Sequence, residues 1–317
     1  MPKATGSRAK AVVIESVKRP LRRIRSDYRE LTASFRGLPS ALVIGAQRSG
    51  TTSIFNYLIQ HPDVVAPLGK EIHYFDLHYA QGVRFYRGRF PYSHRLRNGA
   101  ITLDATPYYL VHPLAPERAA RLLPDIKLIV LLRNPIERAF SHYQHEVRGG
   151  REPLSFVEAL DREAERLAGE EERIRKEPNY YSWNHHRYSY THRGLYAPQL
   201  RRWLEHFPRS QLLVLQSEAM YRDPAAATAR VHHFLGLRDH RLERYEDSYQ
   251  RGNYERSMPA ELRARLAAYF EPHNRELFDL TKAKLNVCRV AFNGVCAGFL
   301  EHFGGHVQAD YVTGWTD

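Results

Sequence analysis

The sequence predicts a three-layer α/β fold in which a central parallel sheet is flanked by helices. Three observations lead to this prediction. An apolar run at 41–44 precedes a glycine-rich loop, a second apolar run covers 126–132, and strand-like and helical patterns alternate as far as residue 280. The chain has 317 residues, 43% of them hydrophobic and 26% charged, so it can form one large domain with a substantial core.

The first strand and the loop that follows it are the most informative stretch. Residues 41–44 are typical of a buried strand, a loop begins at Gly45, and a helix with an apolar stripe begins at Thr51. This order of elements predicts a phosphate site, because backbone N–H groups and the helix dipole converge on an anion there.

The loop differs from the Walker A pattern Gly-x-x-x-x-Gly-Lys-Ser/Thr. Gly45, Gly50 and Thr52 match it, but Thr51 replaces the lysine, and Arg48 is the cation inside the loop. We therefore predict a P-loop-type fold with an unusual phosphate loop, although a plain turn is the alternative for the loop alone. The predicted phosphate-binding residues are Gln47, Arg48, Ser49, Gly50, Thr51 and Thr52.

The run at 126–132 predicts a central strand that ends in Arg133. Ligands bind at the carboxyl ends of strands in such folds. Asn134 and Pro135 predict the start of a helix, which places Ser141 about two turns further on, within reach of the same anion as Arg133. The alternative is an arginine paired with a carboxylate and a serine bonded to backbone.

The other elements follow from apolar periodicity and from Pro or Gly at their ends. We expect strands at 64–67 and 211–215, and a strand that leads to a turn at 101–109. Helices are expected at 113–123, with Glu117, Arg118 and Arg121 on its polar side, at 156–176 as one charged, solvent-exposed helix, and at 200–207, 225–235 and 259–280.

The net charge of +12 and the pI of about 9.7 favour anionic partners without choosing among nucleotides, glycans, nucleic acid and membrane surfaces. Cys288 and Cys296 fit neither a disulfide scaffold nor a zinc pattern. The histidine pairs at 185–186 and 232–233 lack partners at metal-ligand spacing, so we predict no metal site.

Residues 1–40 are expected to form a basic arm, more simply solvated than docked on an anionic surface. The chain contains no apolar run long enough to span a bilayer and no secretory signal, so we predict no transmembrane segment. Peripheral contact with a membrane stays open, and the sequence does not predict the oligomeric state.

Two motifs carry a family resemblance. Gly-Ala-Gln-Arg-Ser-Gly-Thr-Thr at 45–52 resembles the 5′-phosphosulfate loop of sulfotransferases that use 3′-phosphoadenosine 5′-phosphosulfate. Lys-Glu-Ile-His-Tyr-Phe at 70–75 is similar to the heparan sulfate sulfotransferase branch and its bacterial relatives. The resemblance covers about 42–280 and implies a sulfotransferase domain at 41–285, followed by an extension at 286–317 of unassigned role.

The resemblance implies the sulfate donor named above, no metal, and a glycan or small-molecule acceptor instead of nucleic acid. It implies that Arg133 and Ser141 hold the 3′-phosphate and that Arg48 stabilises charge on the leaving group. Glu71 is the implied general base, with a pKa that we expect burial to raise, and His73 is its competitor. Further cofactor contacts are implied at Arg251, Gly252 and Tyr254, and a structural role at Glu218. Animal members typically carry a membrane anchor that this chain lacks, so we expect a cytoplasmic enzyme of bacterial type.

Two departures from the family matter. Arg48 stands where the heparan branch has lysine, and Ala105 stands where the family has a lysine near the acceptor, so the acceptor cannot be carried over. Aromatic and basic segments at 79–90 and 180–196 are expected to flank an open cleft beside Glu71 and to select an acceptor hydroxyl, less readily an amine. The alternative is that these aromatics are core residues.

Two other classes of function remain to be weighed. A P-loop nucleotide kinase needs the Walker lysine and an acidic residue that holds Mg²⁺ at a strand end, where this chain has Arg133. A non-enzymatic protein that binds polyanions or nucleic acid would explain the charge but not the ordered motifs.

Overall fold

A computed structural model describes residues 27–245 and 258–284. Its sheet consists of β1 (Ala41–Gly45), β2 (Leu103–Ala105), β3 (Lys127–Leu132) and β4 (Leu212–Gln216). All neighbouring strands are parallel, in the order β2-β1-β3-β4. The central positions of β1 and β3 explain their nearly continuous apolar sequences, because both faces of such strands are covered.

Helices account for most of the remaining described chain. The α-helices are α2 (Thr51–Leu58), α3 (Gly82–Arg87), α4 (Ala115–Leu122), α5 (Pro135–Arg148), α6 (Phe156–Asp161), α7 (Glu163–Leu167), α8 (Glu170–Lys176), α9 (Trp183–Arg187), α10 (Tyr196–Leu204), α11 (Ser217–Arg222), α12 (Pro224–Leu235) and α13 (Ala260–Lys284). Short 3₁₀ helices are η1 (Ala33–Phe35), η2 (Tyr79–Gln81), η3 (Ser93–Leu96), η4 (Pro107–Leu110), η5 (His192–Gly194) and η6 (Arg209–Gln211).

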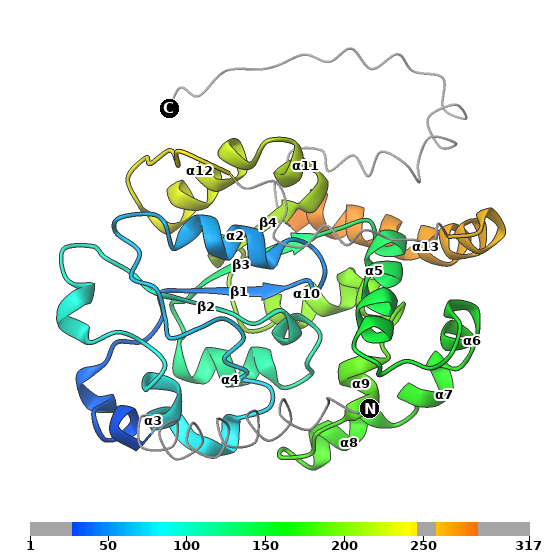
Figure 1. The fold of residues 1–317 in the computed structure, drawn as a ribbon, viewed down its shortest axis with the longest axis horizontal. Helices are drawn as coiled ribbons and strands as arrows, with labels where there is room; N and C mark the ends of the chain where they lie inside the picture. Colours follow the sequence, from blue (N-terminus) through cyan, green and yellow to red (C-terminus); the bar gives the residue numbers. More distant parts are fainter. Residues whose placement is uncertain (1–26, 246–257, 285–317) are drawn as a thin grey trace, which may run out of the picture.

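Helices cover both faces of the sheet, which confirms the predicted three layers (Figure 1). Leu42, Leu128 and Val130 pack with α4 and α10 on one face, because successive strand residues point to opposite sides. Val43 and Ile129 pack with α2 and α12 on the other. A separate cluster joins α5, α6 and α13 beside the carboxyl ends of the strands.

The turn between β3 and α5 is built as predicted. The side chain of Asn134 accepts hydrogen bonds from the backbone N–H groups of Ile136 and Glu137, at 3.0 and 3.4 Å. Pro135 is the first residue of α5. An N-cap of this kind stabilises a helix by about 1 kcal/mol. It fixes where Arg133 leaves the sheet and where Ser141 emerges from the helix.

The predicted strand at 64–67 is wrong. Val64 forms one isolated parallel bridge to Ile101, and no ladder follows. Proline at position 67 has no N–H group to donate, and the N–H group of Leu68 already bonds the carbonyl of Arg89. This segment is therefore an extended connection that delivers the chain to residue 70.

The single helix predicted at 156–176 is also wrong, because three helices replace it. Gly169 adopts a left-handed φ of 73° between α7 and α8, a conformation that favours glycine. Glu163 is buried and accepts hydrogen bonds from the backbone N–H groups of Thr191 and His192. The segment packs against the chain near residue 190 instead of forming one solvated face.

Two further predictions are wrong. The sequence placed Arg118 on the polar side of its helix and Tyr86 in a segment beside a cleft, but both side chains lie in the interior. Arg118 of α4 is buried and donates hydrogen bonds to the carbonyls of Phe75 and Pro178. Tyr86 is fully buried, and its ring stacks on Tyr74 with the centroids 4.4 Å apart. Periodicity identifies a polar face but cannot foresee backbone carbonyls that reach it from a distant loop.

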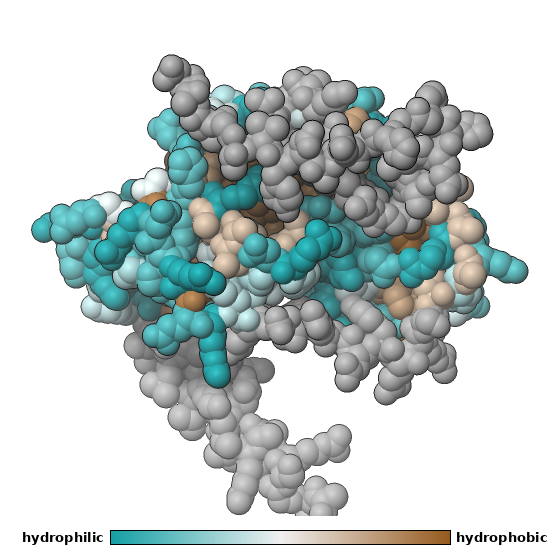
Figure 2. Space-filling view, turned by 90° about the horizontal axis from the view of Figure 1, so that it is seen from above, coloured by the Kyte–Doolittle hydropathy of each residue, from teal (hydrophilic) through white to brown (hydrophobic). Residues whose placement is uncertain are grey.

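The described end of the basic arm packs against the domain instead of lying free in solvent. Arg36 is buried, donates a hydrogen bond to the carbonyl of Phe90 and lies over the ring of Tyr92. Hydrophilic side chains predominate among the coloured residues of the face in Figure 2, and apolar side chains form separate patches. In the described part of the chain, no helix has the length and apolar character that crossing a membrane requires.

Candidate functional site

The phosphate loop meets the N-terminus of α2 at Gly50, whose φ is 89°. A Cβ at this position would lie 2.6 Å from Met220 Cε and 3.0 Å from Tyr221 Oη, so the turn requires glycine. Within the described residues, no side chain caps α2, and the buried Ser49 hydroxyl has no hydrogen-bond partner. The loop therefore keeps donors available for an anion, which fits a bound phosphosulfate.

Two arginines and a serine surround this loop. Arg48 Nε donates to Ser141 Oγ at 3.0 Å, and Arg133 Nη1 donates to the carbonyl of Arg48 at 3.0 Å. A polar cavity of about 40 Å³ opens between these groups. Its lining includes Arg48, Gly50, Thr51, Thr52, Arg133 and Tyr221. The structure thus brings together the residues that the sequence singled out at two strand ends.

Gln47 is held from the other side of the loop. Its side-chain oxygen, Oε1, accepts a short hydrogen bond from Arg193 Nη1. Burial lowers the pKa of this arginine to about 10, yet it stays charged at neutral pH. Arg193 also donates to the carbonyls of His185 and His186, so one guanidinium ties the loop to α9. The sequence did not identify Arg193, because nothing local predicts that it is buried.

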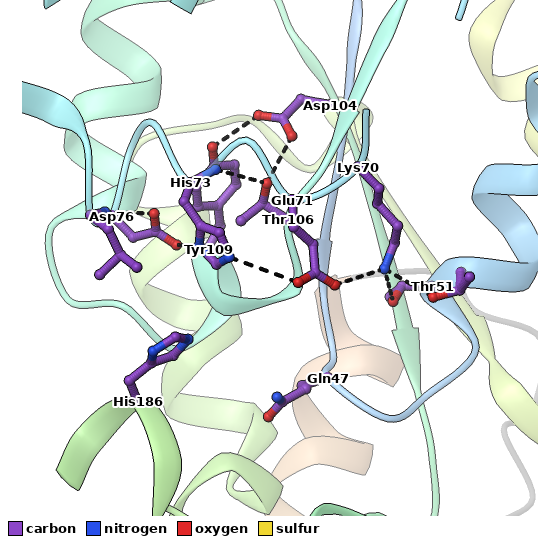
Figure 3. A network of polar contacts seen from close by, with 12 residues as sticks. Gln47, Thr51, Lys70, Glu71, His73, Asp76, Asp104, Thr106, Tyr109 and His186 are labelled. Carbon is purple, nitrogen blue, oxygen red and sulfur yellow. Dashed lines mark hydrogen bonds and ion pairs between the residues drawn. The ribbon is translucent and has the colours of Figure 1, made fainter. Parts of the chain in front are cut away.

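A chain of charged contacts joins the loop to the predicted base (Figure 3). Lys70 Nζ lies 3.0 Å from Thr52 Oγ1 and 3.0 Å from Glu71 Oε1. Glu71 Oε2 lies 3.8 Å from His73 Nε2, and His73 Nδ1 lies 2.8 Å from Asp76 Oδ2. The lysine that the loop itself lacks is therefore supplied from position 70, in the neighbouring motif.

This chain sets the charge of each member. Burial by itself raises the pKa of Glu71, but the nearby imidazolium of His73 and the ammonium group of Lys70 outweigh it and lower the pKa to about 2. Burial lowers the pKa of His73, but the Asp76 carboxylate and then Glu71 raise it to about 10. The expectation that burial would raise the pKa of Glu71 is thus wrong. At neutral pH the carboxylate can accept a proton and the imidazolium cannot.

Asp104 of β2 anchors the loop that carries Glu71 and His73. Its carboxylate is fully buried and accepts hydrogen bonds from Thr106 Oγ1 at 2.8 Å and Tyr109 Oη at 2.9 Å. The same tyrosine oxygen accepts from the backbone N–H group of Tyr74 at 2.8 Å. Burial raises the pKa of Asp104 to about 6 against these hydrogen bonds, which lower it. The loop that carries Glu71 and His73 is therefore anchored in the core.

Backbone strain also marks these positions. Among the described non-glycine residues, positive φ values occur at Arg48 (66°), Glu71 (60°), His73 (55°) and Asn98 (59°). Each such residue costs on the order of 1–3 kcal/mol, and such strain clusters at functional sites. Of these residues, the first three are the predicted catalytic residues.

The two aromatic segments behave differently. The segment at 79–90 contributes core residues such as Tyr86, so it does not line a cleft. The segment at 180–196 reaches the site, because the rings of His186 and His73 meet edge to face at 5.8 Å. Figure 3 shows His186 and Gln47 on the same side of Glu71 and His73. The ring of His186 contacts that of Tyr181, which contacts that of Trp183, and the last two side chains are 41% and 45% exposed.

Of the remaining residues that the sequence singled out, two are described by the structure and three are not. Glu218 accepts a hydrogen bond from the Asn134 N–H group at 2.9 Å, in line with the structural role predicted for it. Ala105 is fully buried in β2, with no cation to offer. Arg251, Gly252 and Tyr254 lie outside the described residues.

Known proteins show clear similarity to this chain. The family model for the sulfotransferase domain matches residues 38–260. Heparan sulfate glucosamine 3-O-sulfotransferase 6 of Mus musculus is 33% identical over 268 residues, which cover 78% of this chain and 72% of that relative. Heparan sulfate glucosamine 3-O-sulfotransferase 3A1 of the same organism is 38% identical over 201 residues, covering 63% of this chain and 46% of the relative. The chain thus spans about half the length of several curated relatives.

A solved structure agrees with these matches. The crystal structure of a sulfotransferase from Alicyclobacillus acidocaldarius is 32% identical, with a TM-score of 0.59. The match covers 78% of this chain and 96% of that chain. The fold of the chain is therefore that of a solved sulfotransferase over most of its length.

We predict that Asp76→Asn lowers the pKa of His73 from about 10 toward the ordinary value near 6.5, because the carboxylate is the main group that favours the imidazolium. An NMR titration measures this, with His73→Gln to assign the signal and exposed Asp125→Asn as the control. A raised folded-state pKa stabilises the fold fully below about pH 6.5, and the contribution disappears as pH rises through 10. An unshifted His73 signal in Asp76→Asn would contradict the assignment.

Proposed function

Because the chain belongs to the sulfotransferase family, we propose that it transfers a sulfuryl group from 3′-phosphoadenosine 5′-phosphosulfate to a hydroxyl of a glycan, with Glu71 as the general base. The observation that carries the proposal is the continuous chain of contacts from the phosphate loop through Lys70 to the ionised Glu71. The family match favours this reading over a nucleotide kinase and over a protein that only binds polyanions.

The donor is bound by groups at the carboxyl ends of β1 and β3. The loop N–H groups at the start of α2 and the Ser49 hydroxyl hold the 5′-phosphosulfate. Arg133 and Ser141 hold the 3′-phosphate, each already joined to Arg48 by a hydrogen bond. Dianionic phosphate groups match this concentration of positive charge.

The chemistry then needs one proton acceptor and stabilisation of the leaving group. Glu71 accepts the proton of the acceptor hydroxyl while the hydroxyl oxygen forms a bond to sulfur. The bond between sulfur and the bridging oxygen breaks, and 3′-phosphoadenosine 5′-phosphate leaves with the electron pair. Arg48 acts on this leaving group as a fixed charge, since a guanidinium does not readily give up a proton.

Lys70 has a double role in this proposal. Its ammonium group touches both Thr52 of the donor loop and the carboxylate of Glu71. A phosphosulfate at the loop draws the ammonium toward the developing negative charge. As the cation moves away from Glu71, the carboxylate becomes more basic at the time when it must take a proton.

The glycan acceptor is supported by the surface beside His73. Ring contacts run from His73 to His186 at 5.8 Å, from His186 to Tyr181 at 5.6 Å, and from Tyr181 to Trp183 at 6.4 Å. The two exposed rings, those of Tyr181 and Trp183, suit the apolar faces of sugars. The curated relatives named above act on heparan sulfate glucosamine, and this chain is strongly basic, as binding of an acidic glycan requires.

We predict that Arg133→Ala and Ser141→Ala each weaken binding of 3′-phosphoadenosine 5′-phosphate by about tenfold or more, because each removes a hydrogen bond to a charged group. Isothermal titration calorimetry measures the affinity, and circular dichroism checks the fold. Arg121→Ala on the exposed face of α4 is the matched control. Unchanged affinity in both site variants would contradict the assignment of Arg133 and Ser141 to donor binding.

We predict that Glu71→Gln lowers kcat by about 10²-fold or more and leaves donor affinity unchanged, because the amide keeps the shape but cannot accept a proton. Turnover with labelled donor and a panel of heparan-type oligosaccharides measures the loss. Glu117→Gln, exposed on α4, is the control. If Glu71→Gln stays active while His73→Ala is inactive, the base has been assigned to the wrong residue.

We predict that Lys70→Ala lowers kcat by about 10²–10³-fold, as the loss of one preorganised donor does. The acid limb of the pH–rate profile should move to higher pH, since removal of the cation raises the pKa of Glu71. Lys70→Arg keeps the charge and should recover part of kcat. A Lys70→Ala variant with an unmoved acid limb would show that the lysine does not act through Glu71.

A further inference from the structure

A carboxylate and two imidazoles from separate helices converge beside the candidate acceptor side. They are Glu171 of α8, His185 of α9 and His192 of η5, and their ligand atoms all lie within 4.8 Å of one another. We propose that these three side chains bind a divalent transition metal, Zn²⁺ first of all, as a structural site outside the catalytic centre. The sequence prediction that these histidines lack metal-binding partners missed this cluster, because Glu171 reaches them only through the fold.

The distances suit a tetrahedral ion. The same carboxylate oxygen, Glu171 Oε1, lies 3.0 Å from His192 Nε2 and 3.6 Å from His185 Nε2. Ligand atoms around a tetrahedral Zn²⁺, bound at about 2.0–2.1 Å, lie about 3.3 Å apart. The two separations from Glu171 Oε1 lie within a few tenths of an ångström of this value, and all three ligand atoms lie within 4.8 Å of one another. A water completes the coordination.

The buried imidazole of His185 provides an independent indication of a ligand. Its ring is 1% exposed, and its Nδ1 lies 2.7 Å from Tyr108 Oη. Its Nε2 has no hydrogen-bond partner among the described residues and faces Glu171. When Nδ1 donates its hydrogen to Tyr108, the Nε2 lone pair points at a carboxylate, and a cation between them satisfies both groups. A second-shell hydrogen bond of this type is what orients a ligating histidine.

The surrounding charges allow such a site. Arg202 donates to Glu171 Oε2 at 3.1 Å, which leaves Oε1 turned toward the imidazoles. Glu171 and His192 are each about one third exposed, at 31% and 32%, so an ion can enter from solvent.

The metal would join three short helices that lie next to the proposed active site. Helices of three to seven residues hold few hydrogen bonds of their own, so a shared ion stabilises their packing. The same segment carries His186, which meets His73, and Arg193, which holds Gln47. The ion would thus keep the acceptor side in place without taking part in the transfer.

Metal binding by the tag-free full chain tests the proposal, first stripped with a chelator and then titrated with Zn²⁺ against a chromogenic chelator. We expect one equivalent of Zn²⁺ per chain. We expect His192→Gln to weaken this binding by at least about tenfold. His233→Gln, an exposed histidine on α12, is the matched control and should bind as the wild type does. Circular dichroism of the metal-free proteins confirms that His192→Gln is folded.

Co²⁺ provides a second readout that does not depend on activity. A tetrahedral site produces intense visible absorption, whereas a six-coordinate ion on surface histidines absorbs weakly. We expect the intense bands in the wild type and in His233→Gln, and their loss in His192→Gln and Glu171→Gln. No stoichiometric Zn²⁺ binding by the wild type, weak bands only, or equal binding by His192→Gln would overturn the proposal.

Discussion

The ion-pair chain from Lys70 through Glu71 and His73 to Asp76 is the interaction on which the site depends. It connects the phosphate loop, through Thr52, to the loop that carries Glu71 and His73. Alternating charges hold each other ionised, which lowers the pKa of Glu71 and raises that of His73. This arrangement explains why a carboxylate next to a histidine, and not the histidine, is free to accept a proton.

Holding these groups together has a cost that the rest of the fold offsets. Arg48, Glu71 and His73 all have φ values in the left-handed region. The buried Asp104, with its hydrogen bonds from Thr106 and Tyr109, anchors the loop that carries Glu71 and His73. The two hydroxyl oxygens also accept hydrogen bonds from the backbone N–H groups of His73 and Tyr74, so they hold the backbone of this loop in place. Preorganisation of this kind makes fixed charges effective in catalysis, because little reorganisation remains when charge develops.

The phosphate loop of this chain has no lysine at the Walker position, but a lysine from another segment contacts the loop. Thr51 stands at the Walker position, and Lys70 brings an ammonium group to the hydroxyls of Thr51 and Thr52 from across the site. The ammonium group at position 70 also contacts the carboxylate of Glu71, at 3.0 Å. One cation therefore contacts both the phosphate loop and the Glu71 carboxylate.

The sequence by itself determined the local elements of this protein. Gly45 and Gly50 at fixed spacing, Asn134 before Pro135, and the apolar runs at 41–44 and 126–132 act within a few residues, so their outcome follows from backbone sterics and burial. They brought Arg133 and Ser141 next to the loop, where both contact Arg48. They also predicted the parallel sheet, since alternating strands and helices leave few other arrangements.

Only the tertiary structure decided which distant groups meet. The charge of Glu71 depends on its neighbours in space, the burial of Arg118 and Tyr86 on a loop near residue 75, and the grouping of Glu171 with His185 and His192 on how short helices pack. The break of 156–176 into three helices depends on contacts of Glu163 with residues near 191. Such contacts join residues far apart in the chain, and periodicity within one segment carries no information about them.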